Sequence, residues 1–299
     1  MFCEDIAMTR RGALLMGVGA VLGTAAIGAL VEDSSPARAA APTNGLAAGR
    51  AATVAPTTAR TAARTARLAG VTTKPAPHPA AHAPLPPWGQ HWTTAMRRID
   101  DYTRRSPGTR FPSRPVMLTI DDGPSPTWTP RYLQLLARYK IHATFCMIGL
   151  HVQAYPALAR EVAARGHTIA NHTWTHDEQL PYRDQATIWR EIHSTSDVIR
   201  RATGFVPNQF RAPGGVWGPR VFDELQRQHL MPLGWDIDPR DWALPGTPAI
   251  TQAMLAARPL DIVLCHDGGG DRSETYAALQ TVIPALLRRG YHFVTLPRL

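Results

Sequence analysis

Short apolar runs alternate with longer amphipathic segments from about residue 116 to the end of the chain. Uninterrupted apolar runs of this length are typical of buried strands, and apolar residues three or four apart are typical of helices. The pattern predicts strands over 116–122, 143–149, 167–173, 209–215, 231–238, 261–267 and 291–296. It predicts helices over 128–139, 155–166, 183–204, 219–229, 249–257 and 274–290.

The strands and helices alternate about seven times, which indicates an α/β fold. Strands joined through helices form a parallel sheet, because each helix carries the chain back to the same end of the sheet. The simplest expected architecture is a (β/α) barrel.

The first 39 residues have the features of an export signal. Arg10 and Arg11 precede an uncharged, mostly apolar run over 13–30, and Ala37-Arg-Ala39 offers small residues for cleavage. The paired arginines resemble a twin-arginine signal. An uncleaved membrane anchor is the alternative, since the run is at the lower limit for a membrane span. Either way the chain is expected outside the cytoplasm, secreted or associated with the cell wall, with membrane contact only if the segment is retained.

Residues 40–87 are nearly all Ala, Thr, Pro and Arg. Such a segment cannot bury enough apolar surface to offset the entropy of ordering it, so we predict a disordered linker. Large apolar residues return at Trp88, and the length of 88–299 suits a single catalytic domain.

The chain carries a formal net charge of +9. A basic exported protein could contact an anionic cell-wall polymer, although the same charge also serves solubility alone. Basic and aromatic residues are not interleaved as a nucleic-acid groove requires, so nucleic acid is not an expected partner.

Two of the three cysteines, Cys146 and Cys265, lie inside apolar runs, and Cys3 lies in the export signal. An oxidising compartment would permit a disulfide. Free cysteine is also a common small core residue, and we predict two buried thiols.

Polar residues collect where the predicted strands end. In parallel α/β folds this edge carries the active site. The residues found there are Asp121, Asp122, His172, His176, Arg211, Asp236, Asp238 and His266.

Asp121, Asp122 and the two histidines together indicate a metal site. Histidines four apart can share a metal from one side of a helical turn, and adjacent carboxylates repel each other unless a cation neutralises one. One carboxylate and two histidines leave coordination positions open, and the other carboxylate could act as a base on water. Either pair alone would fit a solvated loop equally well.

Two further residues extend this chemistry. Arg211 could orient a carboxylate through paired hydrogen bonds, or form a surface salt bridge. His266 ends a buried strand, where it could serve as a general acid or as a core histidine. The segment "WDIDPRDW" is either part of the site or an acidic loop with packing aromatics.

Five motifs, "TIDDGP", "HTWTH", "RAPGG", "DPRDW" and "IVLCHD", occur in this order within residues 119–267. Together they resemble the polysaccharide deacetylase family, whose NodB homology domain defines carbohydrate esterase family 4. The resemblance covers roughly residues 112–297. It implies a distorted (β/α)7-type barrel and one divalent metal, zinc first, with cobalt or another divalent ion as the alternative.

The resemblance also implies a role for each matching residue. Asp121 would be the catalytic base, oriented by Arg211, and His266 would be the acid, paired with Asp241. The metal would be held by Asp122, His172 and His176. The substrate pocket would be formed by the Gly214 backbone N–H as an oxyanion donor, with Trp242 and Leu264 against the acetyl methyl group. Many members carry an aromatic residue at the position of Gly214.

The expected function is therefore a secreted, metal-dependent hydrolase of the N-acetyl groups of a cell-wall or chitin-like glycan. Peptidoglycan N-acetylglucosamine is the first choice of substrate. Acetylxylan, an ester, and soluble chito-oligosaccharides are alternatives within the family. A non-catalytic glycan-binding wall protein would have lost Asp121 or His266, and both are present.

Overall fold

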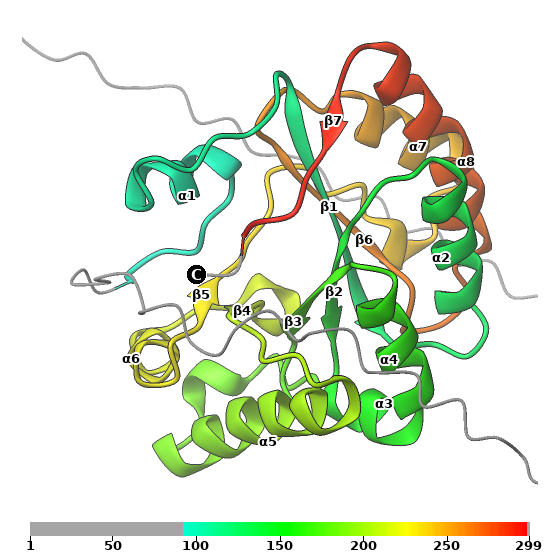
Figure 1. Cartoon of the computed structure of the whole chain (residues 1–299). Helices are drawn as coiled ribbons and strands as arrows, with labels where there is room; N and C mark the ends of the chain where they lie inside the picture. Colours follow the sequence, from blue (N-terminus) through cyan, green and yellow to red (C-terminus); the bar gives the residue numbers. More distant parts are fainter. Residues whose placement is uncertain (1–91, 298–299) are drawn as a thin grey trace, which may run out of the picture. The chain divides into compact units, whose positions relative to one another are not determined.

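The computed structural model describes residues 92–297 (Figure 1). The predicted export signal over 1–39, the predicted linker over 40–87 and Cys3 lie outside the described residues. Predictions for those segments therefore stay predictions.

The core of the described part is a seven-stranded sheet in which every paired strand is parallel. The sheet order is β5-β4-β3-β2-β1-β6, and β7 pairs with the start of β1. This arrangement confirms the predicted α/β class. The strands are β1 Pro115–Gly123, β2 Thr144–Met147, β3 Thr168–Asn171, β4 Gln209–Phe210, β5 Met231–Pro232, β6 Ile262–His266 and β7 His292–Phe293.

The sheet does not close into a continuous hydrogen-bonded ring between β5 and β6. Three isolated bridges span this interval, Met96↔Leu233, Arg98↔Asp261 and Ile237↔Val263. The segment before the first helix thus joins the end of β5 to the start of β6. The architecture is a distorted and incompletely closed version of the expected barrel.

Helices surround the strands, as Figure 1 shows, and all six predicted helices are present. Two short helices were not predicted, because six or seven residues give little periodic signal. No helix among residues 92–297 has the length and apolar character that a membrane span needs. The α-helices are α1 Ile99–Arg105, α2 Thr129–Arg138, α3 Gly149–Ala154, α4 Pro156–Ala164, α5 Gln185–Thr203, α6 Pro219–Arg227, α7 Thr247–Leu255 and α8 Ser273–Arg288, and the 3-10 turns are η1 Leu180–Tyr182, η2 Pro213–Gly215 and η3 Asp241–Ala243.

The alternation of side chains along β1 separates two apolar clusters. Leu118 and Ile120 pack in a cluster with residues of α2, α4, α5, α7 and α8, whereas Met117 packs with Ile262 in a second cluster. Because side chains alternate along a strand, Asp121 lies on the same face as Met117. On this face, apolar residues occupy the first part of β1, and polar residues follow at the carboxyl end of the strand.

Cys146 and Cys265 are both buried and unbonded, as predicted. Burial raises the pKa of each thiol well above its usual value, so both remain protonated at neutral pH.

We expect neither buried thiol to react with a thiol reagent in the folded chain, because a reagent needs an exposed thiolate. Labelling of a Cys3→Ser variant, before and after denaturation, measures this directly. Both thiols should be modified only in denaturant. Rapid modification of the native chain would contradict the burial of Cys146 and Cys265.

Candidate active site

The site forms at the carboxyl ends of β1, β3, β4 and β6. β1 ends in the two adjacent aspartates, and β6 ends in His266. The histidine pair follows β3, and Arg211 follows β4. The fold therefore brings together residues that are up to 145 positions apart in the sequence.

Asp122, His172 and His176 converge as a group of metal-ligand type. One ligand atom from each lies within 4.8 Å of the others. The Asp122 Oδ1 atom is 3.3 Å from the Nε2 atom of each histidine. This Oδ1 atom is buried and accepts no hydrogen bond from another described residue. One carboxylate and two imidazoles in this arrangement fit a divalent cation that keeps open coordination positions.

The histidines do not lie on a helical turn, which corrects the geometry expected from their spacing. Residues 172–177 form an irregular loop. The backbone has a φ of 64° at Thr173 and 62° at His176, and Asp122 has a φ of 70°. Positive φ values are strained for residues other than glycine and often occur at functional sites. The turn is held by the Thr173 hydroxyl, which accepts a hydrogen bond from the His176 N–H at 3.0 Å.

The Arg211 carbonyl sets the tautomer of His172. The His172 Nδ1 lies 2.8 Å from this oxygen, which can only accept, so Nδ1 carries the proton. The Nε2 atom then lies on the side of Asp122, 3.3 Å from its Oδ1, and it can coordinate a cation once it has lost its proton. Such an outer hydrogen bond is a common feature of metal-binding histidines.

The charges of the group favour an ionised Asp122. Burial raises the pKa of this carboxyl, but the nearby His172, with smaller contributions from His266 and His176, holds it well below its usual value. Burial and the charge of His172 lower the pKa of His176. An anionic carboxylate beside a readily neutral imidazole suits cation binding.

Asp121 is fixed by Arg211. The Arg211 Nη1 donates to the Asp121 Oδ1 at 2.7 Å, and both side chains are buried. The same guanidinium also donates to the Thr119 hydroxyl and to the Gly234 carbonyl, each at 2.8 Å. The second oxygen of Asp121 lies 3.8 Å from His172 Nε2. The carboxylate therefore presents one oxygen to Arg211 and the other to the candidate metal site.

His266 pairs with Asp241, as the family resemblance implies. The His266 Nδ1 is 2.7 Å from the Asp241 Oδ1, and the His266 backbone N–H donates to Oδ2 at 2.9 Å. Burial lowers the pKa of His266, but the hydrogen bond and charge of Asp241 outweigh this effect and raise it to about 9. His266 is therefore a cation at neutral pH and can donate a proton.

The three residues expected in the acetyl pocket occupy different surroundings. Leu264 is buried and lies on the same face of β6 as His266. Gly214 is exposed in η2 with a φ of 58°, and a Cβ there would lie 3.3 Å from the Glu178 carboxyl carbon. Trp242 is half-exposed in η3, where the Arg240 guanidinium lies 5.1 Å from its ring centre.

Two aspartates from the predicted cluster do not join the site. Asp236 is exposed and forms an ion pair with Arg98 at 3.5 Å. Asp238 accepts a hydrogen bond from the Arg240 N–H at 2.8 Å and shapes its own loop. The strand predicted over 231–238 ends at Pro232, so these residues do not continue the sheet edge.

Sequence reasoning missed two residues that support the site. Thr119 contacts Arg211, and its position two residues before Asp121 on β1 could have indicated this. Asp267 is buried and accepts a hydrogen bond from the Thr129 hydroxyl. Burial raises its pKa to about 7. Its backbone N–H donates to the Asp121 carbonyl at 3.0 Å, so it ties β6 to the end of β1.

The α/β fold and the site together are typical of a hydrolase. A candidate metal group, a buried carboxylate and a charged histidine lie at one edge of the sheet. Residues 108–232 match the polysaccharide deacetylase family. A chitooligosaccharide deacetylase of Rhizobium leguminosarum bv. trifolii is 42% identical over 197 residues, which cover 62% of this chain and 91% of that protein. A peptidoglycan-N-acetylglucosamine deacetylase of Bacillus cereus is 41% identical over 189 residues, covering 62% and 87%.

A solved structure of a deacetylase is also similar to this chain. The crystal structure of a peptidoglycan N-acetylglucosamine deacetylase superimposes with a TM-score of 0.60 at 30% identity, covering 63% of this chain and 88% of that one. The chain belongs to the polysaccharide deacetylase family.

Proposed function

We propose that this chain is a secreted, metal-dependent hydrolase that removes N-acetyl groups from N-acetylglucosamine units of a glycan, releasing acetate and a free amine. Peptidoglycan is the favoured polymer, and zinc is the favoured metal. The observation that carries the proposal is the position of a fixed carboxylate, Asp121, and a charged histidine, His266, beside the group of Asp122, His172 and His176.

The proposed reaction requires both a base and an acid. An acetamide is a poor electrophile and an amine is a poor leaving group. Asp121 would take a proton from the attacking water, and His266 would give a proton to the departing nitrogen. The Gly214 backbone N–H would donate to the oxygen on which negative charge develops. A divalent cation held by Asp122, His172 and His176 would supply Lewis-acid polarisation of the acetyl carbonyl.

The choice of polymer rests on the relatives and on the charge of the chain. Similar proteins are named for deacetylation of chito-oligosaccharides and of peptidoglycan N-acetylglucosamine. A net charge of +9 and the predicted export signal favour an anionic cell wall over a soluble oligosaccharide. Acetylxylan remains the alternative substrate, because a site that hydrolyses an amide could also hydrolyse an ester.

Acetate release tests the proposal. The full chain is stripped with a chelator, reloaded with zinc or cobalt, and assayed on peptidoglycan, N-acetylglucosamine oligomers and acetylxylan in parallel. We expect acetate from the two amide substrates, loss of release after chelation and recovery with added metal. Tight metal binding without acetate from any substrate would favour the non-catalytic glycan-binding alternative. Release from acetylxylan alone would identify an esterase.

A further inference from the structure

The ends of α2, α7 and α8 form one positively charged surface at the amino edge of the sheet. Each of these helices leads into the next strand, so its last turn lies at the edge opposite the candidate active site. Helix α8 contacts both α7 and α2, and β7 lies beside the start of β1 (Figure 1). We call this surface the basic face, and its six residues, all exposed, are Arg114, Arg138, Lys140, Arg258, Arg288 and Arg289.

Contacts between the helix ends hold the basic residues near one another. The Arg289 Nη1 donates to the Leu255 carbonyl at the end of α7, at 2.9 Å. The Arg114 guanidinium lies 4.5 Å from the centre of the Tyr291 ring, just after α8. The positive groups of α7, α8 and the start of β1 therefore lie side by side.

The basic face holds no carboxylate that would neutralise it. No aspartate or glutamate occurs in the sequence over 123–160, 242–260 or 275–299, which include α2, α7 and nearly all of α8. Asp261, just before β6, is buried and pairs with Arg98. Within the described part of the chain, none of the six basic side chains forms an ion pair.

The other half of the same edge is neutralised. At the ends of α4, α5 and α6, carboxylates pair with the basic residues: Arg165 with Glu161 at 2.6 Å, Arg200 with Asp197 at 2.7 Å and Arg227 with Glu224 at 3.1 Å. Basic residues complement the dipole at any helix end, so the dipole accounts for the arginines of both halves. It does not account for the missing carboxylates at the ends of α2, α7 and α8.

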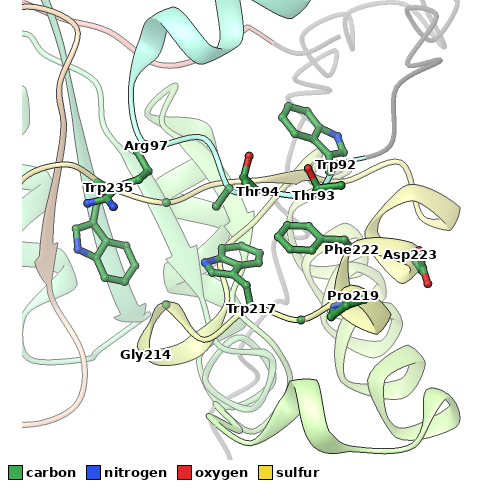
Figure 2. A pocket seen from close by; sticks show the side chains of 14 residues that line it. Trp92, Thr93, Thr94, Arg97, Gly214, Trp217, Pro219, Phe222, Asp223 and Trp235 are labelled. Carbon is green, nitrogen blue, oxygen red and sulfur yellow. Dashed lines mark hydrogen bonds between the residues drawn. The ribbon is translucent and has the colours of Figure 1, made fainter. Parts of the chain in front are cut away.

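The carboxyl edge of the sheet has the opposite character. The loops over 172–184, 233–246 and 267–272 follow β3, β5 and β6, and they hold eight aspartates and glutamates but three arginines. This edge also carries the hollow of Figure 2, where Trp217 and Phe222 lie close to the turn that follows β4. A polyanion is therefore attracted to one edge of the sheet and repelled by the loops of the other.

The basic face lacks large apolar groups. Insertion into a lipid layer requires such groups as well as positive charge. The exposed large apolar residues of the described range all lie elsewhere, at Leu150, Tyr155, Tyr182, Trp189, Val206, Trp242 and Leu244. A charged surface without apolar groups suits a hydrated polymer better than a membrane.

We infer that the basic face binds a linear anionic polymer of the cell wall that carries phosphate groups along its chain. Charge complementarity selects this partner, because exposed cations without counter-charges displace the counterions of a polyanion. Cations spread over three helix ends match a repeating charge better than a single small anion. A polymer bound at the amino edge leaves the carboxyl edge open, so the catalytic residues face away from it. This inference rests on the proposed function for the cell-wall location, and it adds the surface that holds the chain there.

The test measures binding of the full chain to immobilised long-chain inorganic polyphosphate at several salt concentrations. Arg138→Gln/Arg288→Gln removes two charges from the basic face. Arg200→Gln/Arg201→Gln is the matched control, because it changes the net charge by the same amount on the half of the edge where a carboxylate pairs with both arginines. The basic residues over 40–87 are the same in every variant and add the same background.

A second pair keeps the test decisive if the first impairs folding. Lys140→Gln/Arg258→Gln changes two other exposed positions of the same face. Thermal unfolding identifies any variant that is damaged. Acetate release from soluble N-acetylglucosamine oligomers should be the same in all variants, since none of the substituted residues lies at the carboxyl edge.

We expect each basic-face pair to weaken polyphosphate binding by roughly ten- to thirtyfold. The slope of log Kd against log salt concentration should become shallower by about one to two. The control pair should lose about threefold at most, because its charges are already compensated. Equal losses in the control and basic-face pairs, or no loss in the basic-face pairs, would overturn the inference.

Vesicles of phosphatidylglycerol and phosphatidylcholine test the other anionic source. Tighter binding to these vesicles than to polyphosphate, lost in the basic-face pairs, would assign the face to a membrane and refute the polymer. The proposed function is decided separately by acetate release. If the unmodified chain releases no acetate, the proposed function fails, and the polyphosphate titration still decides the basic face.

Discussion

Replacing Asp121 with asparagine is expected to lower kcat by about 10²–10⁴-fold while the chain continues to bind one zinc ion. Asparagine keeps the size of the side chain and can still accept the hydrogen bond from Arg211, but it cannot take a proton from water. The ligand atoms of Asp122, His172 and His176 are unchanged. Acetate release measures the activity, and metal content after gel filtration measures binding.

His172→Ala is the matched variant, and it should lose both metal and activity. Its Nε2 belongs to the ligand group, whereas Asp121 is assigned to proton transfer. Thermal unfolding of both variants is the necessary control, because Asp121→Asn leaves the buried Arg211 without its counter-charge. Near-normal activity in the asparagine variant would exclude Asp121 as the base. Loss of metal from that variant would place Asp121 among the ligands instead.

Most of the fold could be predicted because the buried strands and long helices carry strong periodic signals. The strand predicted over 116–122 appears as β1, and the helix predicted over 183–204 appears as α5. The prediction fails where pairing depends on distant segments. The strand predicted over 231–238 is reduced to Met231–Pro232, since Leu233 pairs with Met96 and Ile237 pairs with Val263 across the open side of the sheet. Local periodicity contains no information about these partners.

The pairs of residues in the site were predicted more accurately than the bounds of the strands. The expected pairs Arg211–Asp121 and Asp241–His266 are both present, because residues at the carboxyl ends of parallel strands meet at one edge. The supporting contacts were not predictable. The backbone carbonyl of Arg211 that holds His172 carries no side-chain signature.

The pH dependence of activity should change when Asp241 is replaced by asparagine. In the unmodified chain the pKa of His266 is raised to about 9, mainly by the hydrogen bond and charge of Asp241 acting against burial. A general acid must be protonated, so kcat/KM should fall as the pH rises through about 9. In the asparagine variant burial still lowers the pKa of His266, the charge of Asp241 is lost, and only the weaker effects of Asp121 and Asp122 still raise it, so the decline should move to a much lower pH.

This shift predicts a large loss at neutral pH and a smaller one in acid. At pH 8 the unmodified chain holds His266 mostly protonated, whereas the variant holds it mostly neutral, which lowers kcat/KM by at least about tenfold. At pH 6 the difference should shrink, because much of the variant's His266 regains its proton. A purely structural role of Asp241 would instead lower activity equally at every pH.

Thr275→Val is the control for this experiment. The Thr275 hydroxyl donates to the Asp241 Oδ2 at 3.0 Å, so the valine variant removes one hydrogen bond of Asp241 without changing its charge. In this variant the fall of kcat/KM at high pH, the basic limb of the pH profile, should stay close to pH 9, because the Asp241 carboxylate still faces His266. If both variants shift the basic limb by the same amount, the packing around Asp241, and not the charge of Asp241, sets the pKa of His266. If neither variant shifts it, His266 is not the acid that the basic limb reports.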